Sequence, residues 1–216
     1  QRQMCIRDRY GGKVRLYDGI KGWFRRINAY GEKRGILVEH YIISSGLREI
    51  IEGTAIAKDF THIYASSFYY NEHGEPCWPA QVINYTNKTQ FLFRIEKGIL
   101  DINDNAVNDH FAEGELRVPF RNIVYIGDSA TDIPCMRLVN SLGGHSVGVY
   151  DFENTASKDT VRRMIRDERI RYYVPADYTK GSEMDILIHR IIDKTAAYEV
   201  LEEKHLRDRK EAVAKY

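Results

Sequence analysis

The sequence is short of cysteine, of net charge and of long apolar runs. Its three cysteines, Cys5, Cys77 and Cys135, are far apart and form no CxxC pair, which argues against a disulfide framework and a cysteine-based zinc site. The net charge of +1 gives no indication of a nucleic-acid groove or of an acidic partner. The apolar runs are too short to span a membrane and no secretion signal is visible, so we expect a cytoplasmic protein that binds no membrane.

The composition is that of a folded domain. A chain of 216 residues can bury a sizeable core, and 29% charged with 12% aromatic residues is typical of globular proteins. The first nine residues, QRQMCIRDR, are basic and follow neither a helical nor a strand period. We interpret residues 1–9 as an adaptor-like leader foreign to the protein, and residues 195–216 as a charged helical tail.

Apolar residues recur at helical spacing or gather in short β-branched runs along the chain. In the first half they predict helices over 18–33, from 47 and from 88, a strand over 36–43, and a hairpin that turns at 72–76. In the second half they predict strands over 122–128, 145–150 and 170–178, and helices over 133–144, 157–170 and 183–193. Residues 101–120 are polar and only weakly patterned. This alternation predicts an α/β fold with a doubly wound, Rossmann-like parallel sheet.

Such sheets carry their active sites at the carboxyl ends of strands. Two polar residues stand out near these ends, one after a strand and one at the start of a helix. Ser44 follows the predicted strand 36–43, and its hydroxyl with the next backbone N–H groups would either cradle an anion or cap a helix. Lys88 begins a predicted helix, where a cation opposes the helix dipole. This placement suggests an anionic partner such as a phosphate, although a single lysine is more typically exposed.

The segment GDSATD, residues 127–132, carries two carboxylates where the strand 122–128 ends. We expect Gly127 to let the backbone turn sharply. Asp128 leaves a buried strand, where a carboxylate needs a metal, a cation or hydrogen-bond donors. Mg²⁺ is a suitable metal, because it prefers oxygen ligands such as carboxylates. Asp132 stands near a helix start and just before Pro134, so it is either an N-cap or part of the same site.

Taken in order, these features resemble the second, third and fourth motifs of the haloacid dehalogenase (HAD) superfamily of phosphotransferases. The order is a strand followed by serine, a lysine at a helix start, and a strand followed by GDxxxD, over about residues 36–150. The hairpin before Lys88 is most similar to that of the phosphoserine phosphatase-like branch. The resemblance implies a HAD core over residues 35–194, with residues 10–34 as a remnant of a helical cap and its linker.

The resemblance also implies a reaction, the magnesium-dependent hydrolysis of a small phosphorylated metabolite through an aspartyl-phosphate intermediate. Ser44 and the amides of Ser45 and Gly46 would bind the phosphoryl oxygens. Lys88 would neutralise charge on the phosphoryl group and on the nucleophile.

The two aspartates of GDSATD would serve the metal in that reaction. Asp128 would bind Mg²⁺, and Asp132 would support the metal shell or Lys88.

The first motif of the family, a strand ending in DxDx[TV], is absent. Asp18 and Asp101 stand in segments without a suitable apolar strand before them. We therefore expect a fragment that lacks the central strand and its nucleophile and is inactive as written. Three alternatives stay open: a non-catalytic relative that binds a phosphorylated ligand or a protein partner, a phosphomutase or phosphonate hydrolase, and an unrelated α/β domain.

Overall fold

The computed structural model describes residues 10–213, so the leader predicted over residues 1–9 lies outside the described residues. The strands are β1 (Tyr41–Leu47), β2 (His62–Tyr70), β3 (Pro76–Gln81), β4 (Val124–Gly127), β5 (His145–Tyr150) and β6 (Tyr172–Pro175). The α-helices are α2 (Ile20–Glu32), α3 (Arg48–Glu52), α4 (Thr89–Lys97), α5 (Ile133–Ser141), α6 (Thr155–Arg166) and α7 (Glu183–Val213). Short 3₁₀ turns complete the fold: η1 (Gly11–Lys13), η2 (Ala57–Asp59), η3 (Asn105–Asn108), η4 (Glu113–Glu115), η5 (Phe120–Asn122) and η6 (Ala130–Asp132).

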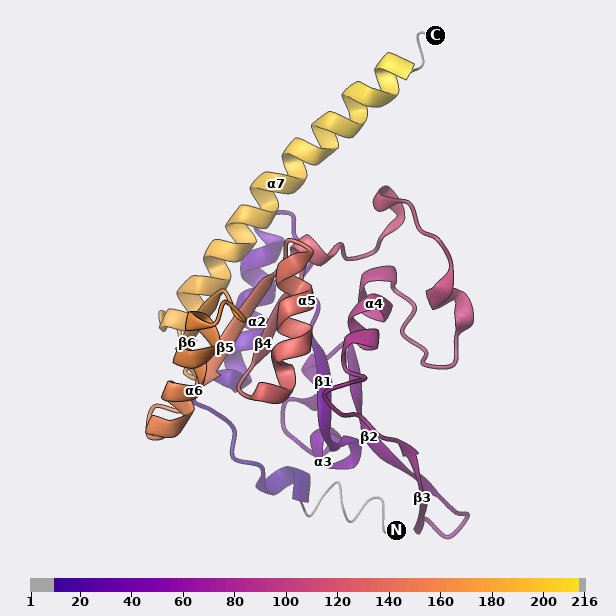
Figure 1. The fold of residues 1–216 in the computed structure, drawn as a ribbon, viewed down its shortest axis with the longest axis vertical. Coiled ribbons are helices and arrows are strands. Elements are labelled where there is room, and N and C mark those ends of the chain that lie inside the picture. The colour runs from indigo at the N-terminus through magenta and orange to yellow at the C-terminus, as the bar shows by residue number, and fades with distance from the viewer. Residues whose placement is uncertain (1–9, 214–216) are drawn as a thin grey trace.

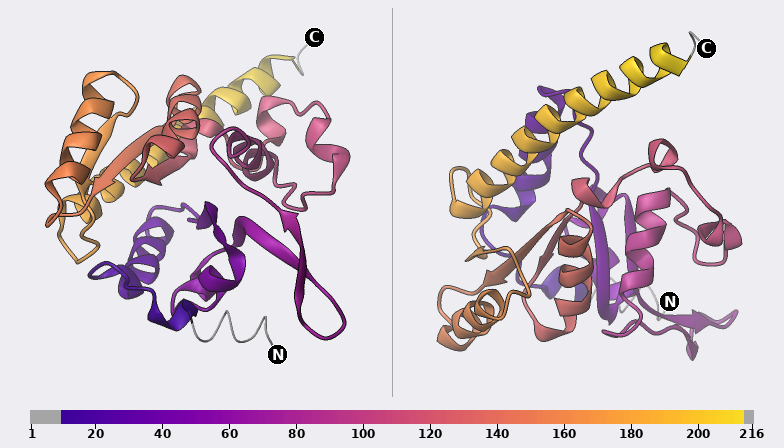
Figure 2. Two further views of the ribbon diagram at one scale, coloured as in Figure 1. Left: turned by 60° about the horizontal axis from the view of Figure 1, so that its bottom comes forward. Right: turned by 45° about the horizontal axis from the view of Figure 1, so that its top comes forward.

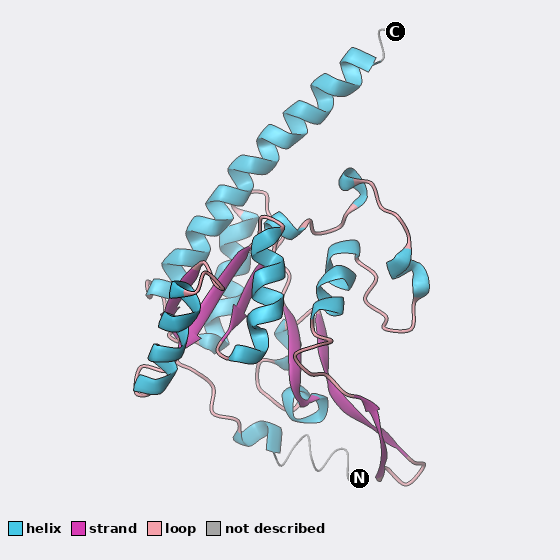
Figure 3. Ribbon diagram, in the orientation of Figure 1, coloured by secondary structure: helices cyan, strands magenta, loops and turns pink. Residues whose placement is uncertain are grey.

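The strands form two three-stranded sheets, which Figure 1 and Figure 3 show side by side between helices. In the first, β1 and β2 are parallel and β3 returns antiparallel to β2, so the predicted hairpin is confirmed. In the second, β4, β5 and β6 are all parallel, in the order β4-β5-β6. The prediction of an α/β fold with parallel strands is confirmed.

Alternate residues of β4 face opposite layers, because side chains on a strand point to the two faces in turn. Val124 and Ile126 pack into a core with α2 and α7, whereas Tyr125 packs into a second core with α5 and α6. The sheet β4-β5-β6 is therefore covered by helices on both faces, as in a doubly wound fold. A third, smaller core lies between β2 and α4, around Tyr64 and Phe91.

The two sheets are not joined into one. In the described part of the chain β1 pairs with β2 and β4 pairs with β5, and no ladder connects β1 to β4. Side chains link the two halves instead: Ile43 of β1 packs against both the second and the third core, and α4 contacts α5. This division falls where the family resemblance implies a further, central strand.

The strand predicted over 36–43 begins later than expected. Residues 36–40 pack across the end of α2, where a Cβ on Gly31 would lie 2.6 Å from Val38 Cγ2 and 2.7 Å from the Ile36 carbonyl oxygen. The Val38 side chain thus packs against α2 and the first core, whereas Leu37 is exposed. β1 runs on through Ser44 to Leu47, with a register shift against β2 between these two residues.

Three other elements differ from their predictions. The helix predicted from residue 47 is confined to the five residues of α3 and ends at Gly53. The weakly patterned stretch 101–120 is a loop with 3₁₀ turns rather than a regular helix. Of the predicted tail, residues 195–213 continue α7 without a break, and Figure 2 shows α7 extending beyond the body of the protein. No helix of the described residues is both long and apolar enough to cross a membrane.

Candidate active site

Lys88 and Asp132 form a buried ion pair between the two halves of the fold. Lys88 is the N-cap residue of α4, and Asp132 ends the turn η6 that follows β4. The Lys88 ammonium donates a hydrogen bond of 2.7 Å to Asp132 Oδ1, and the two residues are only 5% and 6% exposed. Asp132 therefore supplies the anionic partner that a lysine at a helix N-terminus requires.

The remaining hydrogen bonds of Asp132 come from Tyr125 and Ser129. The Tyr125 hydroxyl donates to Oδ1 at 2.9 Å, and the backbone N–H and hydroxyl of Ser129 donate to Oδ2 at 3.3 and 3.1 Å. Both carboxylate oxygens are thus engaged by protein donors. This geometry fits the predicted support of Lys88 by Asp132 and leaves little capacity for direct ligation of a metal.

Tyr125 is a site residue that the sequence patterns did not single out. It lies on β4 with 8% of its surface exposed, and burial, followed by the charge of Asp132, raises the pKa of its hydroxyl far above the usual range. The hydroxyl therefore stays protonated and acts as a donor. Burial likewise raises the pKa of the neighbouring Cys135 thiol to about 11, so this cysteine is not a nucleophile at neutral pH.

Gly127 is required for a different reason from the sharp backbone turn that was predicted. Its φ is not positive, so no left-handed turn follows β4 at this residue. A Cβ here would instead lie 2.8 Å from Asp132 Cβ and Cγ, closer than real contacts allow. The glycine is needed because the Asp132 side chain lies directly against the end of β4.

Asp128 is exposed at the carboxyl end of β4. Within residues 10–213 its carboxylate has no hydrogen-bond partner. Its charge acts on two tyrosines. Burial, then Tyr17, then Asp128 raise the pKa of Tyr178 to about 12, and burial, followed by Asp151 and Asp128, raises the pKa of Tyr17. Asp128 is the carboxylate of this site that is free to bind a ligand.

The predicted phosphate cradle lies at the register shift of β1. Ser44 is half-buried, and its hydroxyl accepts a hydrogen bond of 3.0 Å from the Gly46 N–H. The N-cap of α3 is Leu47, so Ser44 does not cap that helix. Ser45 and Gly46 are exposed. No hydrogen bond within the described residues joins Ser44 or Asp128 to the Lys88–Asp132 pair.

Two further observations limit the site. Among the described residues no group of three or more His, Cys, Asp or Glu side chains is arranged to hold a metal ion. Asp18 and Asp101 lie in loops and on no strand, so neither occupies the strand-end position of the family's first motif.

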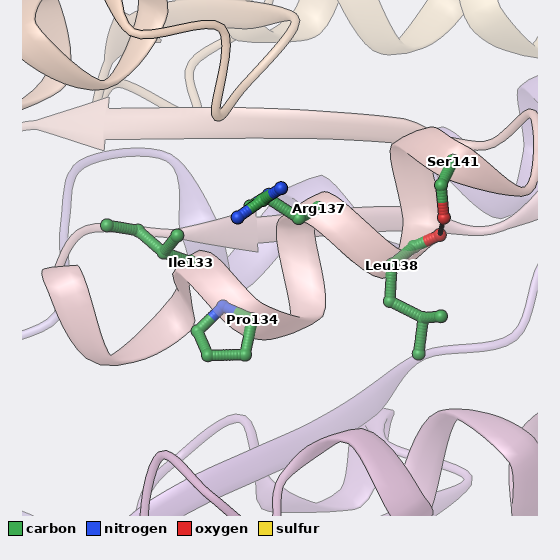
Figure 4. A pocket seen from close by; sticks show the side chains of 5 residues that line it. All are labelled: Ile133, Pro134, Arg137, Leu138 and Ser141. Atoms are coloured by element: carbon green, nitrogen blue, oxygen red, sulfur yellow. Dashed lines mark hydrogen bonds between the residues drawn. The ribbon is translucent and has the colours of Figure 1, made fainter.

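A surface depression on α5 lies outside this site. Figure 4 shows that it is lined by one helix alone, with the Ser141 hydroxyl bonded back to the Leu138 carbonyl oxygen at 2.8 Å. It includes none of the residues predicted for catalysis, phosphate binding or metal binding, although its lining residue Ile133 directly follows Asp132.

Two comparisons with known proteins bear on the family of the chain. A curated relative, an uncharacterized protein of Borreliella burgdorferi strain B31, is 25% identical over 191 residues, which are 81% of this chain and 65% of the relative. The chain thus spans just under two thirds of the length of that relative. The sequence pattern of haloacid dehalogenase-like hydrolases matches residues 3–137, a range that includes Ser44, Lys88, Asp128 and Asp132. The chain therefore belongs to the haloacid dehalogenase-like hydrolase family.

Proposed function

We propose that the protein is a magnesium-dependent phosphomonoester hydrolase that acts on a small phosphorylated metabolite through an aspartyl-phosphate. The observation that carries this proposal is the buried Lys88–Asp132 pair beside the carboxyl end of β4. A buried cation held by one carboxylate at this edge is suited to an anionic substrate. Phosphoryl transfer depends mainly on such positioning and charge.

Within this proposal each polar residue has a distinct part. The Lys88 ammonium faces the transferring phosphoryl group while Asp132 and Tyr125 hold it in place. The Ser44 hydroxyl turns from the Gly46 N–H to a phosphoryl oxygen, and the amides at the β1 register shift donate to the same group. These donors stabilise negative charge, and the only movement that they require is a rotation of the Ser44 side chain.

Asp128 fits a magnesium ligand, because its carboxylate is exposed and has no hydrogen-bond partner within residues 10–213. Mg²⁺ is commonly held by one or two carboxylates together with phosphate and water, so a single protein carboxylate here is compatible with it. When bound, Mg²⁺ would neutralise charge on the phosphoryl oxygens.

The nucleophile would come from a strand that lies between β1 and β4. Two observations support this. The two sheets are separate, and among the described residues no aspartate other than Asp128 directly follows a strand near Lys88. Without that strand we expect the 216-residue chain to be inactive. The β2–β3 hairpin before α4 supports a phosphoserine phosphatase-like arrangement within the family.

The test uses the complete open reading frame from which this chain derives. We expect it to encode an upstream strand ending in DxDx[TV] and to hydrolyse phosphomonoesters only with Mg²⁺. Asp128→Ala should abolish turnover and weaken Mg²⁺ binding measured by calorimetry, whereas Glu153→Ala, an exposed acid near β5, should change neither. Full activity of Asp128→Ala, or turnover by residues 1–216 alone, would contradict the proposal.

A second candidate is a non-catalytic relative that binds a phosphorylated ligand. It is favoured by the same lack of a nucleophile-bearing strand in the described residues. A reading frame that begins near Met4 and a chain that binds phosphomonoesters without turnover would support it over the enzyme.

A further inference from the structure

The last part of α7 stands clear of the rest of the protein. The helix is anchored through the buried Met184, Ile188 and Ile191. Further along, Glu199 accepts hydrogen bonds from Asn122 Nδ2 at 2.8 Å and from Arg121 Nε at 3.2 Å. From residue 200 to 213 the side chains are exposed except the half-buried Glu202. Figure 1 and Figure 2 show this segment extending beyond both sheets.

One face of the segment has a regular charge pattern centred on Leu206, which is 43% exposed. Residues three, four and seven positions away share a helix face with the central residue. Before Leu206 these positions are all acidic, and after it they are basic and apolar: Glu199, Glu202 and Glu203, then Arg209, Lys210 and Val213. We call this set the Leu206 face.

We propose that the Leu206 face pairs with the same face of a second copy, antiparallel about a twofold axis at Leu206. This arrangement places Glu202 opposite Lys210 of the partner subunit and Glu203 opposite Arg209 of the partner subunit. The two Leu206 side chains meet at the axis. The face is thus complementary to itself, which is the requirement for a twofold-symmetric interface.

A parallel arrangement is disfavoured by the same residues, since it would bring Glu202 and Glu203 against their own copies. The segment of 14 residues is about 21 Å long at about 1.5 Å per residue, so the interface is small. Exposed ion pairs contribute little each and are screened by salt. The dimer should therefore be weak, with a dissociation constant in the micromolar range, and it should weaken further at high salt.

The test is sedimentation equilibrium of the full 216-residue chain over a range of concentrations. Glu202→Lys/Glu203→Lys makes the four charge-paired positions (202, 203, 209 and 210) basic, and Arg209→Glu/Lys210→Glu makes the same four positions acidic. For each double variant alone, the self-association constant should fall by about tenfold or more. An equimolar mixture of the two should associate again, because each reversed half then faces an opposite charge.

The control is Lys204→Glu, which reverses a charge on the opposite side of α7 and changes the net charge half as much as the acidic variant. Its self-association should equal that of the wild type, and circular dichroism should show that all variants keep their helix. A monomeric wild type at high concentration, a control as weak as the face variants, or a mixture that does not associate would each overturn the proposal. Binding to anionic lipid vesicles by a monomeric wild type would assign the segment to a membrane surface instead.

Discussion

Asp132 is the residue on which the geometry of the site depends. Its carboxylate accepts hydrogen bonds from Lys88, Tyr125 and Ser129, and Gly127 leaves the room for it. Burying a charge is costly unless it is paired and hydrogen-bonded. Here Lys88 provides the counter-charge, and Tyr125 and Ser129 provide further hydrogen bonds. The Lys88 ammonium is thereby fixed without occupying an oxygen of Asp128.

Lys88→Met should destabilise the protein by about 3–5 kcal/mol, because it leaves the Asp132 carboxylate buried without its counter-charge. Asp132→Asn should destabilise for the converse reason. In the double variant both charges are gone, so the combined loss should fall short of the sum by about 1–3 kcal/mol. Urea unfolding followed by circular dichroism measures the cycle, and additive losses would show that the pair is not coupled.

Gly127→Ala should also act through Asp132. The new methyl would lie 2.8 Å from Asp132 Cβ and Cγ, so the aspartate must move, at a cost of about 1–3 kcal/mol.

Gly12→Ala is the control for that substitution, because nothing lies within 4 Å of the added Cβ. It should leave the unfolding midpoint nearly unchanged. Equal midpoints for the two variants would contradict the close contact at Gly127.

At the scale of elements, β4 and α5 were predictable because their signals are local. An apolar run ending in glycine and an acid, then a proline in a first helical turn, need no knowledge of distant residues. The start of β1 was not predictable from local pattern, since the apolar residues 36–38 lie outside the sheet and Val38 packs against α2. Tyr125 was missed for a similar reason: a tyrosine in a buried strand gives no sign of an acceptor seven residues away.

The middle strand of the second sheet carries a pH-sensitive residue at its start. His145 of β5 is buried, and burial, followed by the charges of Lys194 and Arg171, lowers its pKa to about 4. In the unfolded chain the imidazole titrates near pH 6.5. Between pH 6.5 and 4 the unfolded state therefore binds more protons, and stability falls as the pH is lowered.

His145→Gln should reduce this dependence by up to about 1.4 kcal/mol per pH unit within that window. Unfolding free energies measured from pH 7 to pH 4 give the slope. His73→Gln, at an exposed hairpin position, serves as the control and should leave the slope as it is in the wild type. An unchanged slope in His145→Gln would show that the imidazole is charged in the folded protein.

For the whole molecule, the strands should differ in local stability. β5 is buried at every residue and has a partner on each side, whereas within the described residues β1 and β4 each pair on one side only. Amides of β5 should therefore exchange with solvent more slowly than those of β1 and β4, which native-state hydrogen exchange can measure. Equal protection of β1 and β5 would indicate that the sheets behave as a single cooperative unit.

The division of the sheet also has a consequence for folding during synthesis. β4 begins 77 positions after β1 ends. At a translation rate of about 5–20 residues per second, the ribosome needs about 4–15 s to make that interval. During this time β1, β2, β3 and α4 can assemble around Tyr64 and Phe91, while Ile43 of β1 still lacks the second core against which it packs in the finished fold. An apolar side chain that stays exposed for that long favours aggregation, so we expect binding of chaperones to be strongest in this interval.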